Sequence, residues 1–374
     1  SMLNGQYIKG NVTGAVIWCL TFSWFDYLRF PQHGLLNCNE PWSGHYDVPA
    51  TLPAIAHTTQ FVMPGWQYFN LKDHLMDIGS AVLLVSPSGS DASFIIETSQ
   101  TKSSTHVTFE LPQSIKATEM HVWRTTENEY FKKQQDVTVS SSSISLSLEP
   151  AAIYSITTLK TPGWIETHTI APSKPFPLPY AEDFERYVSD ATVKYFTDQA
   201  GSFSAQPAPL RGSSDMALKQ EVPLAPIPWH YDRVNNVPFT VIGDASWTDY
   251  AVKVDAFIPE GTDGYVYVTT RMPVYSGTRE DDWPRGYSIQ IFTNGTYFLA
   301  SGEPRTVLKK GSTTFPAGSW HDILISVSKS TIDVSINDKA VVTAFTDSKY
   351  TAGAVGLGSG FHYAYFDDFK VYPV

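Results

Sequence analysis

The sequence predicts a mainly β protein in which two antiparallel β-sandwiches follow one another. Between residues 80 and 160, short apolar segments with a period of two are separated by Ser, Gly and Pro. The same alternation returns over residues 181–374. A Pro-rich run, "TPGWIETHTIAPSKPFPLPY" at 161–180, separates the two regions and favours an extended connector over helix or sheet.

The first of these regions, residues 79–160, is expected to form a β-sandwich domain. In "SISLSLE", Ile144, Leu146 and Leu148 alternate with serines, so one strand face is buried and the other faces water. The other predicted strands have the sequences AVLLVS, ASFIIETS, HVTFEL, MHVWRTT and IYSITTL.

Residues 181–374 are expected to form a jelly-roll sandwich of about a dozen strands. Alternating Val and Ile residues mark strands around 250–258, 323–327 and 332–336. The stretch "YSIQIFTNGTYFLA" predicts a hairpin in which Asn294 and Gly295 occupy a type I′ turn.

The first 78 residues follow a different pattern. The run "GAVIWCLTF" at 14–22 predicts a strand buried on both faces, as in a parallel sheet, yet no series of βαβ units accompanies it. Residues 64–78, with Pro64 at the start and Gly79 just beyond, predict a helix. A lone parallel strand and a helix indicate a remnant of a larger domain over 1–78.

Composition excludes several classes of partner. The chain has 26 Lys and Arg against 37 Asp and Glu, a formal charge of −11, without a basic block for nucleic acid. No apolar run reaches the roughly 18 residues of a membrane span, and no signal peptide opens the sequence.

Cys19 and Cys38 can form a disulfide only if the fold brings them together. Asn11 and Asn294 begin glycosylation sequons.

The heptapeptide "EPWSGHY" at 40–46 contains several side chains that could take part in catalysis or binding. Glu40 has no evident second carboxylate for glycoside hydrolysis, so we favour a loop hydrogen bond or ion pair for it, with Trp42 and Tyr46 packed against a neighbouring domain. His45 and His57 lack the spacing of a helical zinc pair.

Trp18 and three acidic residues are further candidates. Trp18 lies near the C-terminal end of the predicted buried strand, where an indole forms either a floor beneath a sugar ring or part of a core. Asp183, Glu185 and Asp367 lie near the first and last strands of the jelly roll, which are often neighbours. They are either calcium ligands or ordinary surface acids.

Taken in order, several stretches resemble the C-terminal part of galactosylceramidases, retaining β-galactosidases that cleave galactolipids. They include GLLNCNEPWSGHY, AHTTQFVMPGWQYF, PFPLPYAEDF, VIGDASWTDYAVKVD and AYFDDFKV, of which EPWSGHY and AHTTQF-x-x-PGW are the specific motifs. The resemblance implies a TIM barrel, a β-sandwich and a lectin-like jelly roll. Residues 14–22 would be the last barrel strand and 64–77 its last helix. Both catalytic glutamates would precede residue 1, so this chain would carry no catalytic residue.

The resemblance also implies a set of binding residues. Trp18 matches a galactose-contacting Trp, Phe30 falls where the family has a galactose-contacting Tyr, and Trp42 lies on a loop that shapes the pocket rim. The calcium ligands would be Asp183, Glu185 in place of an Asn, the backbone carbonyl of Phe203, and Asp367. The family's sugar-binding Arg and its interdomain disulfide have no counterpart.

Two functional hypotheses follow. The first is the C-terminal part of a lysosomal or secreted β-galactosidase that acts on a β-galactoside or galactolipid, with a lipid-presenting activator protein as a further partner. The alternative is a non-catalytic carbohydrate-binding or structural jelly-roll protein. A pure interaction module would instead need a large exposed apolar patch.

Overall fold

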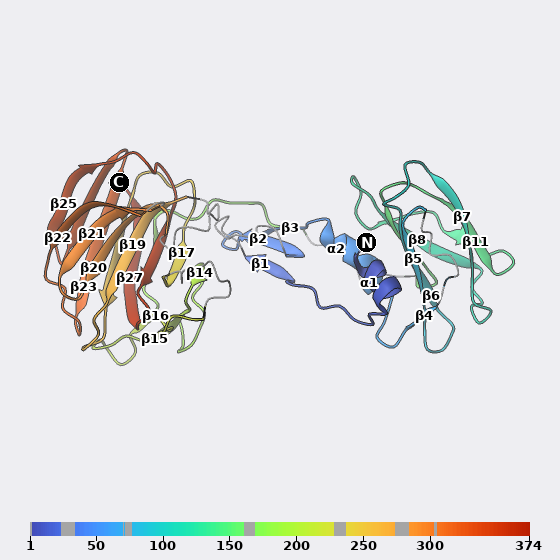
Figure 1. Cartoon of the computed structure of the whole chain (residues 1–374), viewed down its shortest axis with the longest axis horizontal. Coiled ribbons are helices and arrows are strands. Elements are labelled where there is room, and N and C mark those ends of the chain that lie inside the picture. The colour runs from blue at the N-terminus through green and yellow to red at the C-terminus, as the bar shows by residue number, and fades with distance from the viewer. Residues whose placement is uncertain are drawn as a thin grey trace. The chain divides into compact units, whose positions relative to one another are not determined.

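The computed structural model describes residues 2–23, 34–69, 71, 77–160, 169–227, 237–273, 284–302 and 305–374. Its contacts divide the chain into two compact units. The first unit comprises Ser1–Phe22, Gln32–Asn37 and Tyr46–Ile170, and the second comprises Ser23–Pro31, Cys38–His45 and Ala171–Val374. Strands dominate both units, as Figure 1 shows, which confirms the mainly β fold class.

Short elements make up the first seventy residues. They are the helices α1 (Met2–Gly10) and α2 (Thr51–Thr59) and the strands β1 (Thr21–Ser23), β2 (Leu36–Glu40), β3 (His45–Asp47) and β4 (Gln67–Phe69). Strands β1, β2 and β3 form a small three-stranded sheet. In the described part of the chain, neither helix has the length and hydropathy needed to cross a bilayer.

The strand predicted over residues 14–22 is wrong for most of its length. Residues 14–20 have no regular structure, and β1 begins only at Thr21. Val16 and Trp18 are 103% and 85% exposed. A parallel strand needs hydrogen-bonded neighbours along its length, whereas in the described residues this run pairs only near its C-terminal end. There, Leu35 and Leu36 donate to the carbonyls of Cys19 and Leu20, and β1 pairs with β2.

The helix predicted over residues 64–78 is also wrong where the structure describes it. Gln67–Phe69 form β4, which pairs antiparallel with the strand that follows, whereas residues 72–76 lie outside the described residues. The helix instead lies earlier, in α2, a segment expected to be loop, where Pro53, Ala56 and His57 turn to the interior. Backbone pairing with a neighbouring strand outweighed the imperfect helical periodicity.

The sandwich of the first unit confirms the strands expected between residues 80 and 160. They are β5 (Ser80–Val85), β6 (Ala92–Glu97), β7 (Thr105–Glu110), β8 (Glu119–Thr125), β9 (Lys132–Lys133), β10 (Val137–Thr138), β11 (Ser143–Leu148) and β12 (Ile153–Thr157). The larger sheet has the order β10-β8-β12-β6-β5-β4, with β9 beside β8, and β7 pairs with β11. Ile144 and Leu148 are buried in the core between them, as the serine alternation predicts.

The second unit is a two-sheet sandwich (Figure 1). One sheet contains β13 (Tyr180–Glu182), β15 (Phe203–Pro207), β16 (Met216–Gln220), β18 (Tyr250–Phe257), β23 (Trp320–Ser328), β24 (Thr331–Ile336), β25 (Lys339–Thr346) and β27 (Ala364–Pro373). The other contains β14 (Thr197–Ala200), β17 (Phe239–Ile242), β19 (Tyr265–Met272), β20 (Tyr287–Phe292), β21 (Thr296–Ser301), β22 (Thr306–Ser312) and β26 (Ala354–Ser359). Apolar residues from both sheets fill one core.

Two predictions about this unit have different outcomes. The first and last strands, β13 and β27, are neighbours as expected, with Glu182 opposite Phe369. The hairpin between β20 and β21 is present, but its turn is not type I′, because Gly295 alone has positive φ, at 84°. The Gly295 N–H donates to the Phe292 carbonyl at 2.8 Å, which makes a three-residue loop ending in a left-handed glycine.

Candidate functional site

The loop at residues 40–45 is hydrogen-bonded to the segment that enters the second unit. The Trp42 Nε1–H donates to the Lys174 carbonyl at 2.7 Å, and the Lys174 N–H donates to Glu40 Oε2 at 3.1 Å. His45 Nδ1 lies 2.8 Å from the Ala171 carbonyl oxygen. The loop hydrogen bond expected for Glu40 is therefore confirmed, and all three side chains hold the loop in place.

Trp42, expected at a substrate pocket rim, also packs through its ring. The indole meets Phe176 edge-on at 4.8 Å and 67°, and Tyr195 at 6.5 Å and 84°. Pro41 beside it lines a pocket of about 560 Å³ with residues 192–198. The indole ring and its N–H thus already have partners inside the second unit.

Trp18 has the opposite environment. Its side chain is 85% exposed on the irregular segment of the first unit, so its ring face is open to a ligand. Phe30, the other residue expected to contact sugar, lies outside the described residues.

The expected calcium ligands lie around one sheet of the second unit. Asp183 follows β13 and accepts from the Glu185 N–H at 3.3 Å, while Glu185 Oε1 accepts from the Met216 N–H at 3.2 Å. Asp367 lies on β27 between the stretch paired with β16 and the stretch paired with β13, and opposite Asp255 of β18. Phe203 is opposite Gln220, four residues along β16 from Met216, a separation of roughly 13 Å at strand rise.

Asp367 is a buried carboxylate in an acidic surrounding. Burial, with a smaller contribution from the charges of Asp368 and Glu185, raises its pKa to about 7 despite the hydrogen bond from the Asp368 N–H and the charge of Arg211. The Arg211 guanidinium pairs with both Asp367 and Asp255 and lies 3.2 Å from Asp368. Three carboxylates therefore share one guanidinium.

These hard oxygen donors fit the chemistry of calcium, although Arg211 already neutralises part of their charge. Glu185 lies near enough for its negative charge to raise the pKa of Asp367. The carbonyl of Phe203 does not join them, because the strand register places it near the other end of β16.

Both sequon asparagines lie at the surface of their units. Asn11 is exposed with φ 52°, and Asn294 is exposed at the tip of the β20–β21 hairpin. The Asn294 Oδ1 accepts from the Thr296 N–H at 2.9 Å. Cys19 and Cys38 are free thiols, so no disulfide joins them.

An aromatic and polar patch lies on the outer face of the second sheet of the second unit. We call it the aromatic patch; it comprises Tyr265, Gln290, Phe292, Phe298 and Arg305. The neighbouring Val266, Ile289, Ile291 and Leu299 point into the core, so these side chains point away from it. Ring centroids are 5.1 Å apart for Tyr265 and Phe292, and 5.7 Å apart for Phe292 and Phe298. Arg305 Nη2 donates to Gln290 Oε1 at 2.5 Å, and its guanidinium lies 5.8 Å from the Phe298 centroid.

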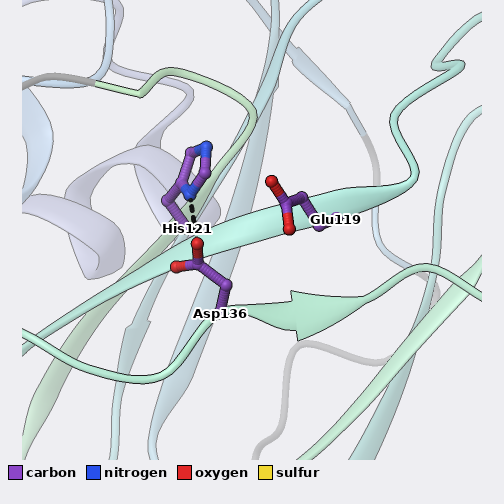
Figure 2. Close-up of side chains that lie close together, drawn as sticks. All are labelled: Glu119, His121 and Asp136. Carbon is purple, nitrogen blue, oxygen red and sulfur yellow. Dashed lines mark hydrogen bonds and ion pairs between the residues drawn. The ribbon is translucent and has the colours of Figure 1, made fainter.

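The first unit contains a cluster of possible metal ligands that sequence analysis missed. Ligand atoms of Glu119, His121 and Asp136 all lie within 4.8 Å of one another, and no other such group of three occurs in the described part of the chain. Figure 2 shows Glu119 and His121 on one strand, β8, with Asp136 alongside. The signal available in the sequence was Glu-x-His within an alternating strand, which places both side chains on the same face.

His57, whose spacing from His45 argued against a zinc site, is a core residue with a hydrogen-bond partner at each ring nitrogen. It is fully buried, with Nδ1 2.7 Å from Ser155 Oγ and Nε2 2.8 Å from Thr125 Oγ1. Burial lowers its pKa to about 3, so the ring is neutral.

Comparison with known families matches both ends of the chain. A model described as glycosyl hydrolase family 59 matches residues 1–60. A model described as the galactocerebrosidase C-terminal lectin domain matches residues 198–373.

Curated relatives match almost the whole chain. Galactocerebrosidase of Homo sapiens is 30% identical over 401 residues, covering 99% of this chain and 57% of the relative. That of Canis lupus familiaris is 31% identical, with 99% and 58% covered, and that of Danio rerio 30% identical, with 99% and 59% covered. The chain therefore spans less than two thirds of the length of these relatives.

Proposed function

The chain belongs to the galactocerebrosidase family, and from this we propose that it acts as the C-terminal part of an enzyme hydrolysing β-galactosides such as galactosylceramide. In this proposal the reaction retains the anomeric configuration through a pair of glutamates. Those glutamates belong to a TIM barrel outside this chain, so residues 1–374 supply substrate contacts and structural support without an acid or a nucleophile.

The observation that carries the proposal is the order of the two family matches. The hydrolase model matches residues 1–60 and the lectin model matches 198–373, while 30% identity extends over 99% of the chain. A single relationship thus accounts for the whole length, from the exposed segment around Trp18 to the last strand.

Within this proposal Trp18 has the most direct role. Its exposed indole offers a flat apolar face, which packs against the apolar face of a galactose ring. Trp42 and Glu40 act indirectly, because their hydrogen bonds to Lys174 fix the loop that carries them. Phe30 in place of Tyr removes a hydroxyl donor and so relaxes selectivity for the sugar.

Four further features complete the proposed function. Asp183, Glu185 and Asp367 are the proposed calcium ligands, without the Phe203 carbonyl, and the ion would have a structural role. Asn11 and Asn294 would carry glycans in a lysosomal or secreted protein. An activator protein that presents the lipid is a proposed partner.

Calcium binding is tested by the melting temperature of the chain with excess calcium or with a chelator. We expect calcium to raise it in the wild type but not in Glu185→Gln, with Glu260→Gln as a matched surface control. An unchanged melting temperature in the wild type would remove calcium from the proposal.

The enzymatic proposal is tested by assaying β-galactoside hydrolysis with this chain alone and joined to the reading frame that precedes it. We expect activity only in the longer product, with the β-anomer of galactose released first. In that product Trp18→Ala should raise KM and leave kcat nearly unchanged, because the indole binds substrate and transition state alike. Hydrolysis by residues 1–374 alone, or release of the α-anomer, would contradict the proposal.

The aromatic patch supports a second candidate function, carbohydrate binding by the second unit. Partly exposed aromatic rings beside an exposed guanidinium are groups that recognise sugar faces and hydroxyls, whereas Gln290, 4% exposed, holds Arg305 in place. We expect the full chain to bind glycans on an array and Phe298→Ala to abolish that binding. Tyr372→Ala, which removes an exposed aromatic ring from the other sheet, should have no effect. An array without signal would count against this function.

A further inference from the structure

Glu119, His121 and Asp136 converge because of the strand register in the first unit. Glu119 and His121 are two residues apart on β8, so their side chains leave the same face of the sheet. Thr138 of β10 pairs with Glu119 and Val137 pairs with Met120, so Asp136 comes next, beside His121. Met120 and Val122 point into the core, which leaves the three ligands on the opposite face.

The existing contacts of the cluster leave the carboxylate of Glu119 without a positively charged partner. His121 Nδ1 lies 2.8 Å from Asp136 Oδ2, the contact drawn in Figure 2, and Lys133 pairs with the other oxygen, Oδ1. Within the described part of the chain, the Glu119 carboxylate forms no hydrogen bond or ion pair, although it lies within 4.8 Å of the other two ligand atoms. Two carboxylates this close repel each other unless a cation lies between them.

We infer that Glu119, His121 and Asp136 bind a divalent transition-metal ion of the zinc type, with a water molecule as fourth ligand. One imidazole nitrogen with two carboxylate oxygens is a donor set that suits zinc, whereas calcium takes oxygen ligands only. The three residues bind an ion that the galactoside-hydrolysing function does not require.

The distances are compatible with a tetrahedral ion. Ligand atoms about 2.0–2.1 Å from zinc in tetrahedral geometry lie about 3.3 Å from one another. The His121–Asp136 separation of 2.8 Å is therefore close to the required value, and a small rotation of the carboxylate opens it. Lys133 does not block the ion, because it occupies the other oxygen of Asp136.

An adjoining pocket provides the open coordination position. It has a volume of about 400 Å³ and is lined by Glu119 and His121 together with Ser90, Asp91, Thr118 and Thr158. Hydroxyl groups and an acid on its walls suit metal-bound water or a small polar ligand. Three protein ligands beside an accessible pocket are typical of a zinc site with an exchangeable position.

The competing interpretation is a buried histidine satisfied by Asp136. His121 is only 7% exposed, and its hydrogen bond to a carboxylate would suffice for that role. This interpretation gives Glu119 no function, so removing the Glu119 charge should leave any affinity of the chain for zinc unchanged. If the three residues bind a metal ion, removing that charge should weaken zinc binding.

The test is zinc titration of the full chain after removal of metal with a chelator, by isothermal titration calorimetry with excess calcium present. We expect one zinc ion per chain. Glu119→Gln should weaken binding at least about tenfold, as loss of a metal-supporting group usually does. Glu110→Gln makes the same change at an exposed position on β7 and should bind zinc as the wild type does.

Two further measurements keep the result interpretable. Asp136→Asn should weaken zinc binding as well, and visible absorption of bound cobalt should change in His121→Gln if imidazole is a ligand. Cys19 and Cys38 remain in every variant, so thiol binding contributes equally to each. Absence of stoichiometric zinc binding in the wild type, or equal affinity in Glu119→Gln and wild type, would overturn the inference.

Discussion

Two tryptophans show how differently the same residue type is used in this chain. Trp18 is 85% exposed, whereas Trp42 donates a hydrogen bond to Lys174 and packs edge-on against Phe176. The first indole is available to a ligand and the second stabilises a loop. Sequence analysis assigned both to substrate binding, and only their environments distinguish them.

This contrast predicts opposite effects on stability. Trp42→Ala should lower the free energy of unfolding by about 2 kcal/mol, since it removes a hydrogen bond and partly buried ring contacts. Trp18→Ala should change it by less than about 0.5 kcal/mol, because an exposed ring gains little on folding. Urea denaturation of both variants measures the difference. Equal effects would show that the indole of Trp18 is buried.

His57 illustrates how a hydrogen-bond network selects a neutral histidine. The Ser155 hydroxyl donates to the His57 carbonyl at 2.7 Å, so its oxygen accepts from Nδ1–H and leaves Nε2 to accept from Thr125. A second proton on the ring would place a donor against the Thr125 hydroxyl in a buried site. Burial is the main reason that its pKa falls to about 3.

A pH dependence of stability follows from this shift. An unfolded histidine titrates near pH 6.5, so between about pH 6.5 and 3 the unfolded state binds a proton that the folded state does not. Stability from this group is therefore complete above about pH 6.5 and declines as pH falls, by roughly 2–3 kcal/mol at about pH 4.5.

Urea denaturation of the wild type and His57→Gln at about pH 7 and about pH 4.5 tests this expectation. The variant is expected to be less stable at neutral pH, because it loses a buried hydrogen bond, yet to lose less on acidification. Identical losses in both proteins would mean that His57 is not buried as a neutral group.

At the scale of single elements, strands with one solvent-exposed face could be predicted from the sequence, whereas the structure of residues 14–22 could not. In β11, Ile144 and Leu148 are buried while Ser145 bonds across the wet face to Thr108. Period two fixes such a strand locally. The run at 14–22 carries no such period, and only Thr21 and Phe22 of it belong to a strand, β1, which pairs with β2.

The β20–β21 hairpin depends on one glycine. Gly295 has φ 84°, and an added Cβ would lie 2.1 Å from the Thr313 carbonyl oxygen. Gly295→Ala should therefore destabilise the second unit by about 2 kcal/mol or more, from backbone strain and a steric clash.

Gly261→Ala is the matched control for this change. Gly261 has φ 78°, but an added Cβ would meet nothing within 4 Å, so the substitution carries the strain without the clash. Thermal unfolding should rank wild type, Gly261→Ala and Gly295→Ala in descending order of stability. If the two variants were equally stable, the close approach to Thr313 would be in doubt.

On the scale of the whole molecule, each compact unit has its own apolar core. Leu83 belongs to the core of the first unit, and Val252 to that of the second, and both are fully buried. Leu83→Ala should cost about 3 kcal/mol and Val252→Ala about 2 kcal/mol.

Hydrogen exchange locates the effect of each substitution. We expect Leu83→Ala to accelerate amide exchange in β5, β6, β8 and β12, and Val252→Ala to accelerate it in β18, β23 and β27. Acceleration throughout the chain in either variant would show that the two cores unfold as one.

The sequence by itself determined the β class, the main strands between residues 80 and 160, and the family, because alternation is a local signal and motifs such as EPWSGHY are read directly. The expectation that the first and last strands of the second unit are neighbours rested on a general tendency of sandwiches, and the pairing of β13 with β27 confirms it.

Only the tertiary structure decided which side chains meet. Glu119 and Asp136 are separated by 17 positions, and the register of β8 and β10 brings both to His121. Sequence spacing could not show this, because a long-range strand pairing is set by packing and backbone hydrogen bonds across the whole sheet. For the same reason, the packing of Trp42 and the exposure of Trp18 were decided by the fold.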